Sequence, residues 1–174
     1  MFINLSDVLS EHHKPIDKVV PVEMTDIGTA LGLMPVIEKE DAHIVVKHVK
    51  QKELTIDGFC RLVLEIPCDR CLEPVATKFD LKFSKNVDLA ADDNQIDELD
   101  EKNYIDGYNL DVDKLLYNEI LIGWPMKILC SETCKGICNT CGQNLNKGTC
   151  NCEDTSLDPR MSVIRDVFKN FKEV

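Results

Sequence analysis

Nine cysteines are the residues of this 174-residue sequence with the most evident chemistry. Eight of them form two clusters along the chain, and the ninth, Cys60, stands alone and is expected to be a small buried apolar side chain. Disulfides are the weaker expectation, because the sequence begins without the basic and apolar stretches of a secretory signal. Metal binding is the stronger one, since eight thiolates can supply two tetrahedral sites.

The segment that begins at Cys138 has the form of a zinc knuckle. Two cysteines at the spacing C-x2-C can hold one ion from a tight turn, whose backbone N–H groups then bond to sulfur. Gly142 can adopt the left-handed conformation that closes such a turn, and a hairpin over residues 144–148 would return two more cysteines to the same ion. Four protein ligands leave no position for water, so this zinc site is predicted to be structural. Its predicted ligands are Cys138, Cys141, Cys150 and Cys152.

A possible second zinc site combines two more pairs of cysteines. One pair is a C-x2-C at the end of a predicted strand, and the other is a C-x3-C just beyond the predicted helix. Its ligands would be Cys68, Cys71, Cys130 and Cys134. Other partitions stay open, including one in which Cys134 joins the first set. The sequence therefore predicts one or two zinc ions.

Redox chemistry at Cys68 and Cys71 is the alternative for that C-x2-C. A redox pair usually lies at a helix N-terminus after a strand, where the nucleophilic thiol has a lowered pKa. Here Pro74 follows Cys71 closely and the next stretch has the pattern of a strand. This context disfavours a redox site at Cys68 and Cys71. The sequence contains no evident nucleophile–base arrangement, and we expect neither a catalytic residue nor a small-molecule substrate.

The elements that must position the cysteines are mainly strands, predicted at 17–24, 43–50, 52–57, 59–66 and 75–85. In the last of these, Phe79, Leu81 and Phe83 alternate with polar residues. The fold class is therefore α+β, with an antiparallel sheet or small open barrel packed with one helix. A cysteine-rich zinc-binding tail and an amphipathic C-terminal helix follow. The predicted domains are 1–129 and 130–174.

The single helix within the first domain is predicted over 111–124. Asp111 is its candidate N-cap, Leu115, Leu116, Ile120 and Leu121 form its apolar stripe, and Pro125 ends it. Glu119 lies beside that stripe and is expected at its flank. The C-terminal helix begins near Asp158-Pro159. Its apolar residues are Met161, Ile164, Phe168 and Phe171.

The net charge of −11 is concentrated in one segment. Residues 88–113 hold ten acidic residues and one lysine, and we expect an exposed acidic loop over 88–108. The overall acidity argues against non-specific binding of polyanions. Charges interrupt every apolar run, so no membrane span is predicted, and a cytoplasmic location, or its equivalent in an organelle, is expected.

Several motifs together resemble the YceD family, the large ribosomal RNA subunit accumulation proteins. They are Cys68-Asp69-Arg70-Cys71-Leu72-Glu73-Pro74, Asn109-Leu110-Asp111-Val112-Asp113, Trp124-Pro125-Met126-Lys127, the run from Cys130 through Gly142, Asn144-Leu145-Asn146, Cys150-Asn151-Cys152 and Asp158-Pro159-Arg160. The resemblance spans about residues 17–172. It implies a bacterial or plastid factor needed for accumulation of large-subunit ribosomal RNA, and it supplies no catalytic residue.

Two kinds of partner would suit such a role: a ribosomal protein or precursor RNA of the large subunit. The acidic segment could hold a basic ribosomal protein, whereas a lysine face could contact RNA phosphates. The candidate lysines of this face are Lys47, Lys50, Lys78 and Lys82, together with Lys52 and Lys85, from neighbouring predicted strands. The net negative charge favours the protein partner. A zinc-ribbon adaptor of the transcription machinery is a further alternative.

Overall fold

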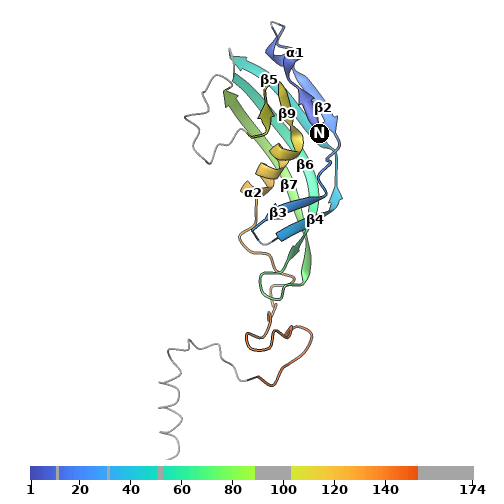
Figure 1. Ribbon diagram of the computed structural model, residues 1–174, viewed down its shortest axis with the longest axis vertical. Coiled ribbons are helices and arrows are strands. Elements are labelled where there is room, and N and C mark those ends of the chain that lie inside the picture. The colour runs from blue at the N-terminus through green and yellow to red at the C-terminus, as the bar shows by residue number, and fades with distance from the viewer. Residues whose placement is uncertain (11, 31, 51–52, 89–102, 153–174) are drawn as a thin grey trace, which may run out of the picture. The chain divides into compact units, whose positions relative to one another are not determined.

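The computed structural model describes residues 1–10, 12–30, 32–50, 53–88 and 103–152. The chain forms two compact units. The first contains residues 1–66 and 76–126, and the second contains 67–75 and 127–174, of which the structure describes the part up to residue 152. Antiparallel strands dominate the first unit, as the sequence predicted (Figure 1).

A six-stranded antiparallel sheet is the main element of the first unit (Figure 1). Its strands are β2 (Ile16–Val20), β3 (Asp26–Thr29), β4 (Gly32–Lys39), β5 (Ala42–Lys50), β6 (Glu53–Pro67) and β7 (Pro74–Asp88). β5 and β4 pair with successive parts of β6, with His43 opposite Phe59 and Lys39 opposite Leu62. β7 also pairs with β6, which is therefore the strand around which the sheet is organised.

A smaller sheet and two helices complete the first unit. β1 (Phe2–Asn4), β9 (Asn109–Asp111) and β8 (Ile105–Asp106) pair in that order, and α1 (Ser6–Leu9) follows β1. α2 (Val112–Ile122) begins at the predicted N-cap, because the Asp111 side chain accepts a hydrogen bond from the Lys114 N–H. α2 is tied to β3 by the Tyr117 hydroxyl, which donates to the Gly28 carbonyl at 2.9 Å.

The core follows the period-2 pattern expected for strands covered on one face. On β7, Phe79 and Leu81 are buried, whereas Lys78, Asp80 and Lys82 are exposed, so the predicted alternation is confirmed. Core side chains from the sheet and α2 are 2% exposed or less: Ile44, Val46, Leu54, Ile56, Leu62, Leu64, Leu115, Leu116 and Ile120.

Gly58 does not separate two strands, and the predicted break there is wrong. β6 runs through it because the Phe83 ring of the neighbouring strand occupies the space beside this glycine. A Cβ at position 58 would lie 2.1 Å from Cζ of Phe83. The glycine therefore makes room for an aromatic ring within a continuous 15-residue strand.

Other parts of the structure differ from the sequence predictions or lie outside the described residues. The hairpin of β3 and β4 was not predicted. Of the expected loop over 88–108, residues 89–102 are not described, while Tyr104 is buried and Ile105–Asp106 form β8, so the prediction is wrong at its end. The predicted C-terminal helix lies outside the described residues. Among the helices that are described, none has the length and apolar character to cross a bilayer.

Candidate metal centres

The first four-cysteine group, Cys68, Cys71, Cys130 and Cys134, combines two parts of the second unit. Cys68 directly follows β6, and Cys130 lies in the segment after α2. Two reciprocal hydrogen bonds hold these parts together: the Asp69 N–H donates to the Ile128 carbonyl at 2.9 Å, and the Ile128 N–H donates to Oδ2 of Asp69 at 2.6 Å. Asp69, between the first two cysteines, thus anchors the segment that leads to the other two.

The sulfur atoms of this group are spaced for a metal ion. Cys68 Sγ lies 3.9 Å from Cys134 Sγ, and Cys71 Sγ lies 3.5 Å from Cys130 Sγ. Zn–S bonds of about 2.3 Å in a tetrahedron place sulfurs about 3.8 Å apart, whereas a disulfide requires about 2.05 Å. All four sulfurs lie within 4.8 Å of one another, so the group can hold a metal ion.

Apolar packing encloses most of the first group. Cys68, Cys71 and Cys134 are buried, and Val75, Leu129 and Ile137 pack against them, whereas Cys130 is exposed. Hydrogen-bond donors reach the sulfurs: among them, the Cys130 N–H bonds to Cys68 Sγ at 3.4 Å, and Nδ2 of Asn146 bonds to Cys134 Sγ at 3.2 Å. No pattern in the sequence assigns Asn146 to this group.

The second group, Cys138, Cys141, Cys150 and Cys152, is more open. Its sulfurs also lie within 4.8 Å of one another, and Cys141 is exposed while the other three are partly buried. The knuckle has the predicted geometry: the Thr140 N–H donates to Cys138 Sγ at 3.4 Å, and Gly142 has a φ of +73°. A turn at Asn144–Lys147, closed by a 3.1 Å hydrogen bond from the Lys147 N–H to the Asn144 carbonyl, leads the chain back to Cys150.

Both groups contain the same knuckle turn. The Gly142 N–H donates to the Cys138 carbonyl at 2.8 Å, and the Leu72 N–H donates to the Cys68 carbonyl at 3.0 Å. Leu72 has a φ of +60°, so a leucine occupies the left-handed position that glycine occupies in the second knuckle. Its side chain is 64% exposed. The sequence did not reveal this equivalence, because leucine rarely adopts a positive φ.

Ionisation in the first group is uneven. Burial disfavours the Cys68 thiolate, but backbone N–H groups, foremost that of Arg70, outweigh it and lower its pKa to about 6. The Asn146 side chain is the main cause of the lowered pKa of Cys134. A backbone N–H favours the Cys71 thiolate, yet burial and the adjacent thiols raise its pKa to about 12. Four thiolates at this spacing therefore need a cation between them.

The second group shows the same pattern. The N–H groups of Cys141 and Thr140 lower the pKa of Cys138 to about 6. The neighbouring Cys141 sulfur, together with burial, raises the pKa of Cys152 to about 12. The pKa is lowered for Cys68 and Cys134 in the first group and for Cys138 in the second, and it is raised for thiols beside them. A divalent ion between the sulfurs would relieve this conflict.

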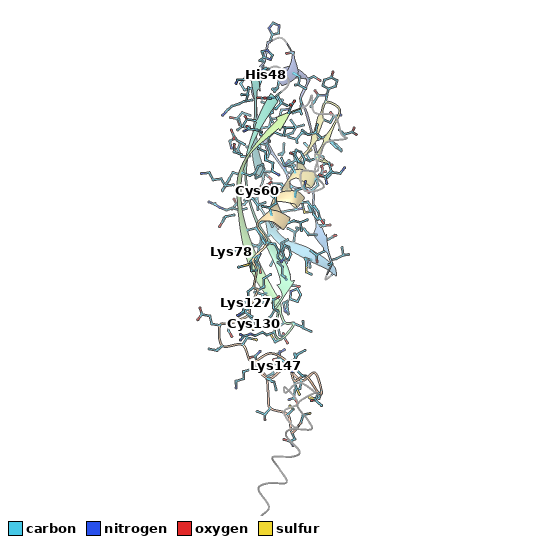
Figure 2. All side chains as sticks on the ribbon, turned by 90° about the vertical axis from the view of Figure 1, so that its left-hand side faces the viewer. His48, Cys60, Lys78, Lys127, Cys130 and Lys147 are labelled. Carbon is cyan, nitrogen blue, oxygen red and sulfur yellow. The ribbon has the colours of Figure 1, made fainter. Side chains whose placement is uncertain are left out.

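The candidate lysines lie on a face where charges alternate in sign. Lys47 is 3.4 Å from Asp57, and Asp80 lies between Lys78 and Lys82 and pairs with Arg61 at 3.2 Å. Lys50 is exposed on β5, and Figure 2 labels Lys78 on β7. Lys52 lies outside the described residues.

Lys85 was expected on that face, and this prediction is wrong. It lies on the opposite face of β7 from Lys78 and Lys82, because its position is odd where theirs are even. Its Nζ lies 2.6 Å from Oε1 of Glu119 and 5.5 Å from the centroid of the Tyr104 ring. The Glu119 side chain is 11% exposed, so this acidic residue is more enclosed than its predicted flank position implied.

The structure thus defines a mostly antiparallel β protein that carries two cysteine groups able to hold metal ions. Its sequence matches the model of a known family over residues 56–168, a range that contains both groups. The chain belongs to the YceD family, described as large ribosomal RNA subunit accumulation proteins.

Two curated relatives carry the same description. The chain is 26% identical over 149 residues to the large ribosomal RNA subunit accumulation protein YCED homolog 1, chloroplastic, of Zea mays, which covers 69% of this chain and 50% of that protein. It is 26% identical over 130 residues to the protein of the same name from Arabidopsis thaliana, which covers 59% of this chain and 40% of that protein. The chain thus matches at most half the length of these relatives. No solved structure matches it.

Proposed function

We propose that this chain is a non-enzymatic factor in ribosome biogenesis that supports accumulation of large-subunit ribosomal RNA. The observation that carries the proposal is the family match over 56–168, which contains both cysteine groups and the whole acidic segment over 88–113. The curated relatives are named for the same process. The proposal assigns no catalytic residue.

Each four-cysteine group is proposed to hold one structural zinc ion. All four ligands of each site come from the chain, so no position is left for a substrate or an activated water. The backbone donors at Cys68 and Cys138 stabilise thiolates, which are the form that zinc binds. Zinc in these sites would fix the fold of the second unit and would take no part in a reaction.

The direct partner is proposed to be a basic ribosomal protein. The acidic segment over 88–113 carries a net charge of −9 and would attract such a protein. The lysine face supports RNA binding less well, because Lys47 and Arg61 already pair with Asp57 and Asp80. Contact with precursor RNA through Lys47, Lys50, Lys78 and Lys82 is the alternative route.

A thiol–disulfide redox role for Cys68 and Cys71 is the second candidate, and the lowered pKa of Cys68 is the observation that favours it. Burial of both sulfurs and the presence of two further cysteines around them argue for a metal ion instead. Cys71→Ser separates the two roles. A redox protein would lose activity and keep its fold and metal content, whereas a zinc protein would lose one ion.

The ribosomal role is tested by sedimentation of cell extracts that contain the tagged chain. We expect the chain to migrate with precursors of the large subunit, and we expect its depletion to lower large-subunit ribosomal RNA more than small-subunit RNA. Co-purification with RNA polymerase and absence from ribosomal particles would support the transcription-adaptor alternative and contradict the proposal.

Two charge variants identify the route. Replacing Asp92, Asp93, Asp97 and Glu98 with their amides removes four negative charges from the acidic segment without changing side-chain size. Lys78→Ala/Lys82→Ala removes two positive charges from the sheet. The protein route predicts that only the first variant dissociates from the particles. The RNA route predicts that the Lys78→Ala/Lys82→Ala variant dissociates from the particles and that its residual binding to them depends less on salt.

Two further proposals concern organisation and location. We propose that residues 1–129 form a β-rich domain and that residues 130–174 form a zinc-binding segment with a terminal helix. We also propose a cytoplasmic location. The curated relatives are named chloroplastic, so their names do not support it.

A further inference from the structure

The loop between Cys141 and Cys150 belongs to the second group by sequence, but its side chains contact the surroundings of the first. Residues 142–149 separate these two cysteines, and both ends of the loop are therefore ligands of the second group. Near one end, the Cys138 N–H donates to the Gln143 carbonyl at 2.8 Å. A metal ion in the second group would thus fix the loop at both ends.

Asn146, in the middle of this loop, bonds directly to the first group. Its Nδ2 donates to Cys134 Sγ at 3.2 Å, while its Oδ1 accepts from the Lys135 N–H at 2.8 Å. The backbone of Asn146 is also fixed, because its N–H donates to Oδ1 of Asn144 at 2.9 Å. Both ends of the side-chain amide are therefore used, and its orientation toward the sulfur is determined.

Glu73 provides a second connection, on the other arm of the first group. Its Oε1 accepts from Nδ2 of Asn144 at 3.1 Å and from Nζ of Lys147 at 2.5 Å; Figure 2 labels Lys147. Glu73 follows Cys71 by two residues. The backbone adds a third connection, from the Leu145 N–H to the Gly136 carbonyl at 2.9 Å. The turn at 144–147 thus contacts both cysteine-bearing arms of the first group.

We propose that the turn at Asn144–Lys147 couples the two metal sites, so that an ion in the second group increases the affinity of the first group for its own ion. Asn146 is the positioning residue through which the coupling acts. The inference rests on metal occupancy of both groups, which is part of the proposed function, and it is independent of the role in ribosomal RNA accumulation.

The physical basis is the cost of placing the Asn146 amide. An N–H···S hydrogen bond offsets negative charge on a four-thiolate site and orients one ligand, and removal of such an outer partner typically costs about 10–100-fold in metal affinity. When the second group holds no ion, neither end of the loop is fixed. The conformational entropy lost when the loop is ordered then reduces the free energy of metal binding at the first group. By thermodynamic linkage, an ion in the first group raises the affinity of the second by the same factor.

The test measures zinc affinity of each site in the full chain, by competition with a chromophoric chelator and with ¹¹³Cd NMR to assign each ion to its group. Cys138→Ser/Cys141→Ser removes the second site. We expect the affinity of the first site to fall about 10-fold or more. Cys68→Ser/Cys71→Ser is the reciprocal variant, and the affinity of the second site should fall by the same factor.

Asn146 variants identify the route of the coupling. Asn146→Ala with both groups intact should lower the affinity of the first site about 10-fold. In the Cys138→Ser/Cys141→Ser background the same substitution should have almost no further effect, since the amide is already unplaced. Asn146→Asp keeps the acceptor for the Lys135 N–H and removes the donor to sulfur, so it should match or exceed the loss.

Two controls keep the result interpretable. Asn151→Ala removes an exposed amide between two ligands of the second group and should leave the first site unchanged. Glu73→Gln weakens the connection on the other arm and should lower the zinc affinity of the first site less than Asn146→Ala does. This variant still tests the coupling if the Asn146 variants do not fold.

Each outcome has a distinct meaning. Equal affinities of the first site with and without the second would overturn the coupling and leave two independent metal sites. A loss from Asn146→Ala that persists undiminished in the Cys138→Ser/Cys141→Ser background would also overturn it. A chain that binds no metal would overturn the proposed zinc sites themselves. None of these results bears on sedimentation with ribosomal precursors.

Discussion

The two cysteine groups close around the same knuckle turn, but they are assembled over very different distances along the chain. In the first, Cys71 and Cys130 are 59 residues apart, whereas all ligands of the second lie within residues 138–152. Most sulfurs of the first are buried, and those of the second are partly or fully exposed. One site thus depends on the folded chain around it, and the other depends mainly on a local turn.

This difference affects what a bound metal contributes. An ion in the first group closes a long loop, and the entropy that such a link removes from the unfolded chain increases with loop length. An ion in the second group closes only short loops and is more accessible to chelators. We therefore expect the first site to contribute more to stability and the second to exchange its metal faster.

Metal removal should have the largest effect. Structural zinc in small domains contributes an apparent binding free energy of roughly 10–16 kcal/mol at neutral pH. Chelation should therefore abolish the native NMR signals of residues 130–152, while the sheet residues of β5 and β6 retain theirs. Native signals for 130–152 in metal-free protein would contradict the metal assignment. Re-addition of zinc is the control for reversibility.

Loss of one cysteine pair should separate the two sites. Wild-type protein is expected to contain close to two zinc ions per chain, and Cys68→Ser/Cys71→Ser and Cys138→Ser/Cys141→Ser about one each. The first variant should unfold at a lower temperature than the second, because it opens the longer loop and leaves buried polar groups. Zinc analysis and thermal denaturation measure both effects. A wild-type ratio of one, unchanged in the first variant, would restore the redox alternative.

A substitution in the core of the first unit should give a smaller effect and leave metal content unchanged. Leu116→Ala removes a fully buried side chain of α2 and should lower the free energy of unfolding by about 2–5 kcal/mol. Urea denaturation followed through the sheet measures this change, and zinc analysis is the control. Zinc loss in parallel with this change would show that the two units do not fold separately.

Substitutions at the left-handed positions of the two knuckles should produce the smallest effects on the affinity for metal, and these effects should have opposite signs. Gly142→Ala places a Cβ at a φ of +73°, where no other atom lies within 4 Å, so it should cost about 1 kcal/mol through backbone strain alone. Leu72→Gly relieves strain at a φ of +60° and should stabilise the first site by up to about 1 kcal/mol. Chelator competition in each variant measures these changes. Marked destabilisation by Leu72→Gly would mean that the exposed leucine makes a contact of its own.

The sequence predicted the elements whose patterns are local. The alternation along β7 and the N-cap at Asp111 were both correct, because each depends on residues within one strand or one helical turn. The strand break at Gly58 was wrong, since the Phe83 ring that fills its space comes from a strand 25 residues further along. The hairpin of β3 and β4 was missed because glycines and Pro35 interrupt its apolar pattern.

In the metal sites, too, the sequence predicted local features and missed contacts between distant segments. The knuckle at Cys138 and the positive φ of Gly142 were expected from spacing alone. The placement of Lys85 against Glu119 and the bond from Asn146 to Cys134 were not, because each joins side chains from separate segments. A polar residue between two cysteine pairs has no local pattern that distinguishes a partner of sulfur from a residue exposed to solvent.

By itself, the sequence determined a β-rich chain with one knuckle, a second C-x2-C pair and eight cysteines in numbers suited to metal, since C-x2-C spacing and period-2 burial operate over a few residues. Tertiary structure decided that Cys68 and Cys71 meet Cys130 and Cys134, and that Asn146 contacts a sulfur of this group and not its own. The physical reason is that thiols can share one ion only where the backbone brings them within a few ångströms. That approach depends on hydrogen bonds such as those between Asp69 and Ile128, across 59 residues of chain.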